Sequence, residues 1–98
     1  MPTYISLLRY TEQGIRDIKN APNRRLDNAR KAYQAAGAKL KDFYLVLGQF
    51  DAVVISEAPD EATVAKLVLA IGALGNVRSE TVRAFTEEEY KTIVGSLA

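Results

Sequence analysis

The chain contains no cysteine, no histidine and no tryptophan among its 98 residues. The lack of cysteine excludes disulfide bonds, thiolate nucleophiles and iron–sulfur clusters. The lack of histidine excludes Ser-His-Asp and Cys-His catalysis, haem held by an axial imidazole and the 2-His-1-carboxylate iron site. Any catalysis would have to rely on Tyr, Asp, Glu, Lys, Arg, Ser, Thr or backbone groups. We expect no metal ion and no cofactor.

An excess of charge of either sign is also lacking, because 13 Lys and Arg stand against 12 Asp and Glu, for a net charge of +1. Such a chain has no strong positive electrostatic field that would attract nucleic acid. No apolar run approaches the ~18 residues of a membrane span. The N-terminal Met1-Pro2-Thr3-Tyr4-Ile5 has no basic region ahead of an apolar core, as a signal peptide would have. The sequence therefore predicts a cytoplasmic protein with neither nucleic acid nor membrane as a partner.

Apolar side chains, in contrast, are plentiful enough for a packed domain. They make up 48% of the chain, which excludes a disordered protein, and the length favours one domain, residues 1–98. Runs rich in β-branched and aromatic residues predict strands at residues 3–10, 39–47, 51–58 and 77–85.

Helical patterns fall between these strands. Thr11 can cap a short helical turn that should end near Asn20, because a proline follows. Gly37 suits a left-handed helix terminus. It follows apolar residues at helical spacing, namely Leu26, Ala29, Tyr33 and Ala36. A second long helix should open at Pro59 and stop at Gly75. Its expected buried stripe is Val64, Leu67, Val68, Ile71 and Leu74.

A third helical pattern closes the chain. Thr86 and Glu89 have the spacing of a capping box. The helix behind them is expected to bury Tyr90, Ile93, Val94 and Leu97. The order is then β-α-β-β-α-β plus a terminal helix, the ferredoxin-like plan of the α+β class with an antiparallel four-stranded sheet. Right-handed crossovers place both long helices on one face of that sheet.

The segment from Leu45 to Ile55 reads as two strands joined by a tight turn at Gly48-Gln49, with Gly48 supplying a positive φ. The expected cross-strand pairs are Leu45 with Ala52 and Phe43 with Val54 on one face, and Tyr44 with Val53 and Asp42 with Ile55 on the other. Both faces come out apolar, although the helices cover only one. We therefore expect the second face to be buried by another copy of the chain. The alternative is that a bulge shifts the register and the terminal helix folds back over that face.

Several segments together resemble the GYD domain family. They are Thr11-Glu12-Gln13-Gly14, Lys41-Asp42-Phe43-Tyr44, Gly48-Gln49-Phe50-Asp51, Glu57-Ala58-Pro59-Asp60, Leu74-Gly75-Asn76-Val77-Arg78 and Arg83-Ala84-Phe85-Thr86. The resemblance covers nearly the whole chain. That family is mostly bacterial and is placed among the dimeric α/β barrels, so the resemblance implies assembly as a barrel of this kind. Phe50 replaces the middle Tyr of the naming motif, whereas Gly48 and Asp51 match it.

The stretch from Gly48 to Phe85 is also similar, more weakly, to the effector-binding domain of the feast/famine transcriptional regulators. Those domains assemble through their sheets and bind amino acids at subunit interfaces. No helix-turn-helix segment precedes the domain here. The likeness therefore implies ligand sensing and not DNA binding.

Five residues are candidates for a ligand site near the sheet interface, namely Tyr10, Tyr44, Phe50, Asp51 and Arg78. The aromatic residues can line an apolar pocket or form core. Arg78 can hold a carboxylate or pair with acids nearby or on a partner. Asp51 can act as a general base, with Tyr44 as its acid, or can fix the turn by accepting backbone hydrogen bonds.

Three functions remain open from the sequence. The first is a homo-oligomeric module that binds a small organic molecule. The second is a cofactor-independent enzyme, because other dimeric α/β barrels include monooxygenases and isomerases. The third is a purely structural domain that associates only with itself.

Overall fold

Four strands and four helices make up the computed structural model, which describes residues 1–19 and 22–98. In chain order they are β1 (Thr3–Tyr10), α1 (Glu12–Arg16), α2 (Pro22–Ala35), β2 (Lys39–Leu45), β3 (Ala52–Glu57), α3 (Glu61–Ala73), β4 (Val77–Ala84) and α4 (Glu87–Gly95). Thr11 caps α1, as predicted. The end expected near Asn20 lies outside the described residues.

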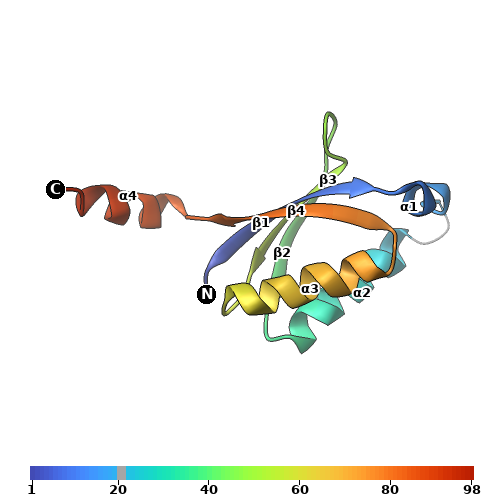
Figure 1. The fold of residues 1–98 in the computed structure, drawn as a ribbon, viewed down its shortest axis with the longest axis horizontal. Helices are drawn as coiled ribbons and strands as arrows, with labels where there is room; N and C mark the ends of the chain where they lie inside the picture. The colour runs from blue at the N-terminus through green and yellow to red at the C-terminus, as the bar shows by residue number, and fades with distance from the viewer. Residues whose placement is uncertain (20–21) are drawn as a thin grey trace.

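The sheet has the order β2-β3-β1-β4, with every neighbouring pair antiparallel. This order confirms the predicted ferredoxin-like α+β fold. The long helices α2 and α3 lie side by side beneath one face of the sheet (Figure 1). The opposite face carries no helix, so one side of every strand is left uncovered.

The hairpin between β2 and β3 has the predicted register. Leu45 pairs with Ala52, Phe43 with Val54, and Tyr44 with Val53. Gly48 takes the predicted positive φ, at 122°. The strands stop earlier than expected, and the loop between them projects past the sheet (Figure 1). Leu47, predicted as part of the strand, is 98% exposed in that loop.

A bulge interrupts β2 at Lys41, since Leu40 pairs with Ser56 and Asp42 with the adjacent Ile55. The extra residue lets Leu40 and Phe43 both face the helices, although their odd spacing would otherwise put them on opposite faces. The bulge lies below the hairpin turn and leaves the turn's register unchanged. A bulge therefore shifts the register, as the alternative supposed, but only away from the turn, and α4 does not fold back over the uncovered face (Figure 1).

The core lies between the sheet and the two long helices. Tyr33 of α2 and Leu67 of α3 pack there against buried strand residues, namely Tyr4, Leu40 and Val54. Two buried positions carry serine, Ser6 and Ser56. Both serines are hydrogen-bonded with the Tyr33 hydroxyl, whose pKa is raised by burial and lowered in part by these bonds. The hydroxyls satisfy one another, as buried polar groups must.

Two segments of the family-like pattern meet at one corner. The backbone N–H of Thr11 donates to the carbonyl of Asn76 at 3.1 Å, and its hydroxyl donates to the carbonyl of Gly75. Gln13 reaches the carbonyl of Leu74 at 3.1 Å. Gly14 is buried against the same turn. These contacts fasten α1 to the turn that begins β4.

The helix termini follow the sequence signals. Gly37 ends α2 with a φ of 78°. At the start of α4, Thr86 and Glu89 form the predicted capping box. Asp60 is the N-cap of α3, where its carboxylate accepts from the backbone N–H and the hydroxyl of Thr63, both at 2.8 Å.

The Asp60 cap predicts a pH dependence of stability. Hydrogen bonding from Thr63, mainly by its backbone N–H, holds the pKa of Asp60 below its ordinary value. A carboxyl whose pKa is lowered by folding stabilises the fold above its unfolded pKa and loses that contribution as pH falls through the folded pKa. We expect the thermal midpoint to fall on acidification below about pH 4. The variant Asp60→Asn keeps a capping oxygen that does not titrate, so its midpoint should fall less. Equal falls in melts followed by circular dichroism would contradict this.

Two expected burials are wrong. Leu74 is 65% exposed, because α3 ends at Ala73 and Leu74 is the C-cap beside the turn. The predicted apolar stripe of α4, comprising Tyr90, Ile93, Val94 and Leu97, is exposed throughout. Figure 1 shows the cause, since the chain leads away from the sheet after β4 and α4 projects from the domain. Within the described residues, no helix is long and apolar enough to cross a membrane.

Candidate functional site

The uncovered side of the sheet, here called the open face, is apolar at its centre. It comprises Ile5 and Leu7 of β1, Tyr44 of β2, Val53 and Ile55 of β3, and Val82 of β4. Strand alternation turns these residues away from the helices. Tyr44 is 57% exposed, and the remaining members are only partly shielded by one another. A sheet face of this kind is the sort of surface that proteins bury against a partner.

The accessible surface of the whole chain is larger than a compact monomer of this size would have. A folded monomer of 10.8 kDa exposes about 5,500 Å², whereas this chain exposes 6860 Å². Its radius of gyration is 14.7 Å, against about 12.6 Å for a compact domain of 98 residues. The surplus of about 1,300 Å² exceeds the roughly 800 Å² that each partner buries in a typical stable complex.

A shallow hollow of about 130 Å³ lies at the margin of the open face, lined by Leu7, Arg9, Phe50, Arg78, Ser79 and Glu80. Arg9 and Arg78 are cross-strand neighbours on that face. The guanidinium of Arg9 lies 4.7 Å from the ring centroid of Phe50, and its Nε donates to the carbonyl of Gln49 at 2.7 Å. The hollow therefore combines two cations, one carboxylate, an aromatic ring and the side chain of Leu7, and its two arginines can hold a small organic anion.

Asp51 holds the base of the hairpin loop. Its carboxylate accepts from the backbone N–H of Tyr10 at 2.9 Å. Its own N–H donates to the carbonyl of Leu8 at 2.8 Å, and its carbonyl accepts from Val46 at 2.9 Å. The first two bonds tie the loop to the end of β1, and the third closes the hairpin at its base.

Removal of the Asp51 carboxylate should therefore destabilise the chain. In Asp51→Ala the N–H of Tyr10 loses its acceptor in a partly buried position, and we expect the free energy of unfolding to drop by about 1–2 kcal/mol. Asp51→Asn retains an oxygen acceptor and should lose less than half as much. Urea unfolding of the two variants checks this. Equal losses would show that the negative charge, and not the acceptor, matters at this position.

The structure brings together only some of the candidate site residues. Phe50 and Arg78 line the same hollow, and Asp51 lies at the adjoining loop. Tyr44 is also on the open face, but on β2, the strand at the opposite edge from β4. Tyr10 has the same parity in β1 as the buried Tyr4, so its side chain is on the helix side.

The sequence reasoning missed one arginine of interest, Arg9, and a second arginine, Arg83, makes contacts within its own chain. Arg9 lines the hollow, and its position two residues after Leu7 in an alternating strand is the signal that places it on the open face. Arg83 lies where β4 leaves the sheet. Its guanidinium is 3.6 Å from a carboxylate oxygen of Glu89 and 4.4 Å from the ring centroid of Phe85. Neither contact could be read from spacing in the chain.

The fold and the open face define a ferredoxin-like α+β module with one covered and one bare sheet surface. The chain belongs to the GYD domain family, whose sequence model, described as GYD domain, matches residues 4–94.

Two relatives accompany this match. A protein of Thermus thermophilus named glutamine synthetase and cystathionine beta-lyase binding protein is 33% identical over 84 residues, which are 86% of this chain and 88% of that protein. The crystal structure of TTHA0845, also from Thermus thermophilus, superposes with a TM-score of 0.56 at 24% identity, over 88% of this chain and 95% of that chain. The second likeness shows the fold alone.

Proposed function

We propose that this protein is a non-catalytic binding module of the cytoplasm, in which two copies associate through their open faces and the assembly binds an enzyme of amino-acid metabolism. The uncovered apolar sheet face carries the self-association, because one chain exposes about 1,300 Å² more than a compact monomer needs. The class of partner rests on the GYD relative that is named for binding glutamine synthetase and cystathionine beta-lyase.

Binding to purified enzymes tests the partner class. The chain is immobilised, and glutamine synthetase and cystathionine beta-lyase from the organism that encodes it are passed over separately. A third oligomeric enzyme of similar charge serves as the control. Saturable binding of either named enzyme, without binding of the control, is the expected result. If neither binds while the chain itself sediments as a dimer, the module associates only with itself and the partner assignment is wrong.

The hollow beside Arg78 favours a second candidate, a small organic anion bound at the margin of the interface between copies. Support comes from the adjacent cations Arg9 and Arg78 and from the ring of Phe50. Amino acids and aromatic acids that bind there should raise the melting temperature, because they bind only the folded state. Arg78→Ala should abolish that rise. Arg16→Ala, which removes an exposed arginine of α1, should not. If none of these ligands raises the melting temperature, this candidate function is wrong.

A further inference from the structure

The junction between β4 and α4 is held straight by Arg83. Its guanidinium donates to the carbonyls of Thr3 and Ala84, forms the ion pair with Glu89, and lies over the ring of Phe85. The pKa of Glu89 lies below its ordinary value, first because the backbone N–H of Thr86 donates to its carboxylate, with Arg83 adding to the effect. These contacts fix the direction in which α4 leaves the sheet.

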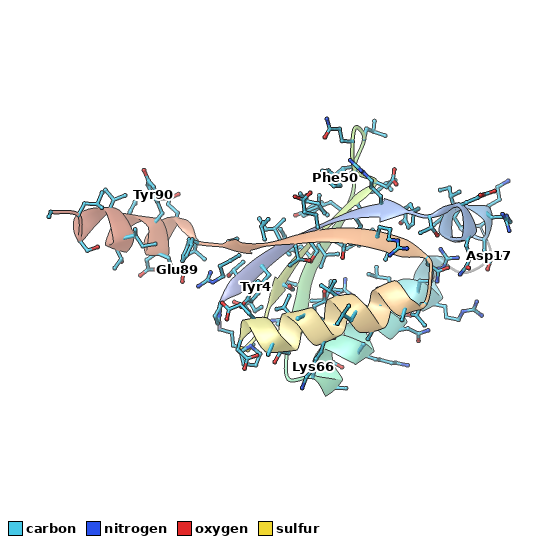
Figure 2. All side chains as sticks on the ribbon, viewed as in Figure 1. Tyr4, Asp17, Phe50, Lys66, Glu89 and Tyr90 are labelled. Carbon is cyan, nitrogen blue, oxygen red and sulfur yellow. The ribbon has the colours of Figure 1, made fainter. Side chains whose placement is uncertain are left out.

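The segment that Arg83 holds out, residues 85–97, is here called the arm. One side of its helix is apolar, with Tyr90, Ile93, Val94 and Leu97 at the i, i+3, i+4 and i+7 spacing of a helix that packs against something. No residue of α4 is buried. Figure 2 shows Tyr90 on the arm pointing away from the domain, with Glu89 beside the junction. The arm's apolar side therefore has no partner within its own described chain.

The surplus surface indicates what covers the arm. A dimer formed by the open faces alone would leave both apolar arms in water, and the surplus of about 1,300 Å² per chain is larger than a typical interface requires. Homodimers commonly bury more than such an interface does, and every contact in a two-fold dimer is made twice. A second copy of the chain can thus provide an apolar surface that covers each arm, and no other protein is needed.

Symmetry also selects the surface on that second copy. Gln49 accepts from Arg9, the cross-strand neighbour of Arg78, so the hairpin loop lies at the end of the sheet where β4 begins. The arm starts where β4 ends. A two-fold axis between two open faces and across their strands reverses the strand direction, so each arm lies at the same end of the assembly as the other copy's loop. Two leucines are exposed in and beside that loop, Leu45 and Leu47.

We infer that α4 is an exchanged arm, whose apolar side docks on the hairpin between β2 and β3 of a second copy of this chain. The inference rests on the proposed self-association and adds the contact that secures it. Each arm then covers the exposed Leu47 of the other copy's loop while its own apolar residues leave water.

Site-specific photo-crosslinking tests the exchange. Benzoylphenylalanine replaces Tyr90 on the apolar side of α4, and in a matched control it replaces Thr92, which lies on the opposite side of the helix. Both proteins are irradiated at the lowest concentration at which sedimentation shows the dimer. The expected result is a covalent dimer from the position 90 probe in at least about fivefold higher yield than from position 92, as face-specific helix contact requires. The cross-link should map to the tryptic peptide of residues 42–66, which carries the hairpin.

The outcomes separate the arm from the dimer itself. A sedimenting dimer that gives no covalent product, equal yields from both probes, or a cross-link outside residues 42–66 would overturn the exchange and leave the open-face association standing. A chain that stays monomeric at high concentration would overturn the self-association first, and the exchanged arm with it.

Discussion

Gly14→Ala should lower the free energy of unfolding by about 3 kcal/mol or more. A Cβ built on Gly14 would lie 2.0 Å from the carbonyl oxygen of Asn76, and that oxygen belongs to backbone. The same carbonyl accepts from the N–H of Thr11 at 3.1 Å. The methyl group can therefore be accommodated only if α1 moves away from the turn before β4, which breaks this bond and those of Gln13 and the Thr11 hydroxyl.

Gly72→Ala is the matched control for this substitution. Gly72 lies inside α3, and apart from its chain neighbours and the helix's own nearby backbone, no described atom lies within 4 Å of the position its Cβ would take. Alanine is the better helix former there, so the control should gain up to about 1 kcal/mol. Urea unfolding of both variants and the wild-type chain measures the difference. A loss below about 1 kcal/mol for Gly14→Ala would mean that α1 can move away from the turn before β4 at little cost. The close approach of these two segments would then not stabilise the fold.

The hairpin was predictable because its signals are local and agree with one another. A glycine at the turn sets the backbone, and the alternation on either side of Gly48 sets the register, so the pairs of Phe43 with Val54 and Tyr44 with Val53 are both correct. The helix caps at Thr11 and Thr86 follow for the same reason, since each depends on a few consecutive residues.

The position of α4 was not predictable, because nothing in its own sequence decides what lies opposite its apolar side. The stripe from Tyr90 to Leu97 correctly indicates a helix with one apolar side. Whether that side is buried by its own chain depends on the direction taken at the junction, which Arg83 sets through contacts with Thr3 and Glu89. Contacts between residues 80 positions apart leave no local signal.

The candidate site, too, could be predicted from the sequence only in part. Phe50 and Arg78 share a hollow, yet they are brought together only because β4 returns beside β1, the last connection of the fold. Aromatic type alone could not tell Tyr10, on the helix side, from Tyr44, on the open face.

Val53→Lys should convert the protein to a monomer, with the dissociation constant of the dimer raised by at least about 100-fold, close to 3 kcal/mol. Val53 lies at the centre of the open face, with Leu7 and Tyr44 as its cross-strand neighbours. In a single copy the new ammonium group reaches water and should change the free energy of unfolding little. In a dimer closed over that face the charge would be buried without a partner.

Leu69→Lys provides the comparison, because Leu69 is 72% exposed on α3, away from the open face. It introduces the same charge in place of a similar apolar side chain, so any general effect of charge on association appears in both variants. Sedimentation velocity over a range of concentrations should show a dimer for the wild-type chain and for Leu69→Lys, and a monomer for Val53→Lys with an unchanged circular dichroism spectrum. If Val53→Lys dimerises as tightly as the control, the open face stays in water in the assembly. The apolar centre of the sheet would then need a different partner, and the enzyme proposed as the partner of this module would be the first to test there.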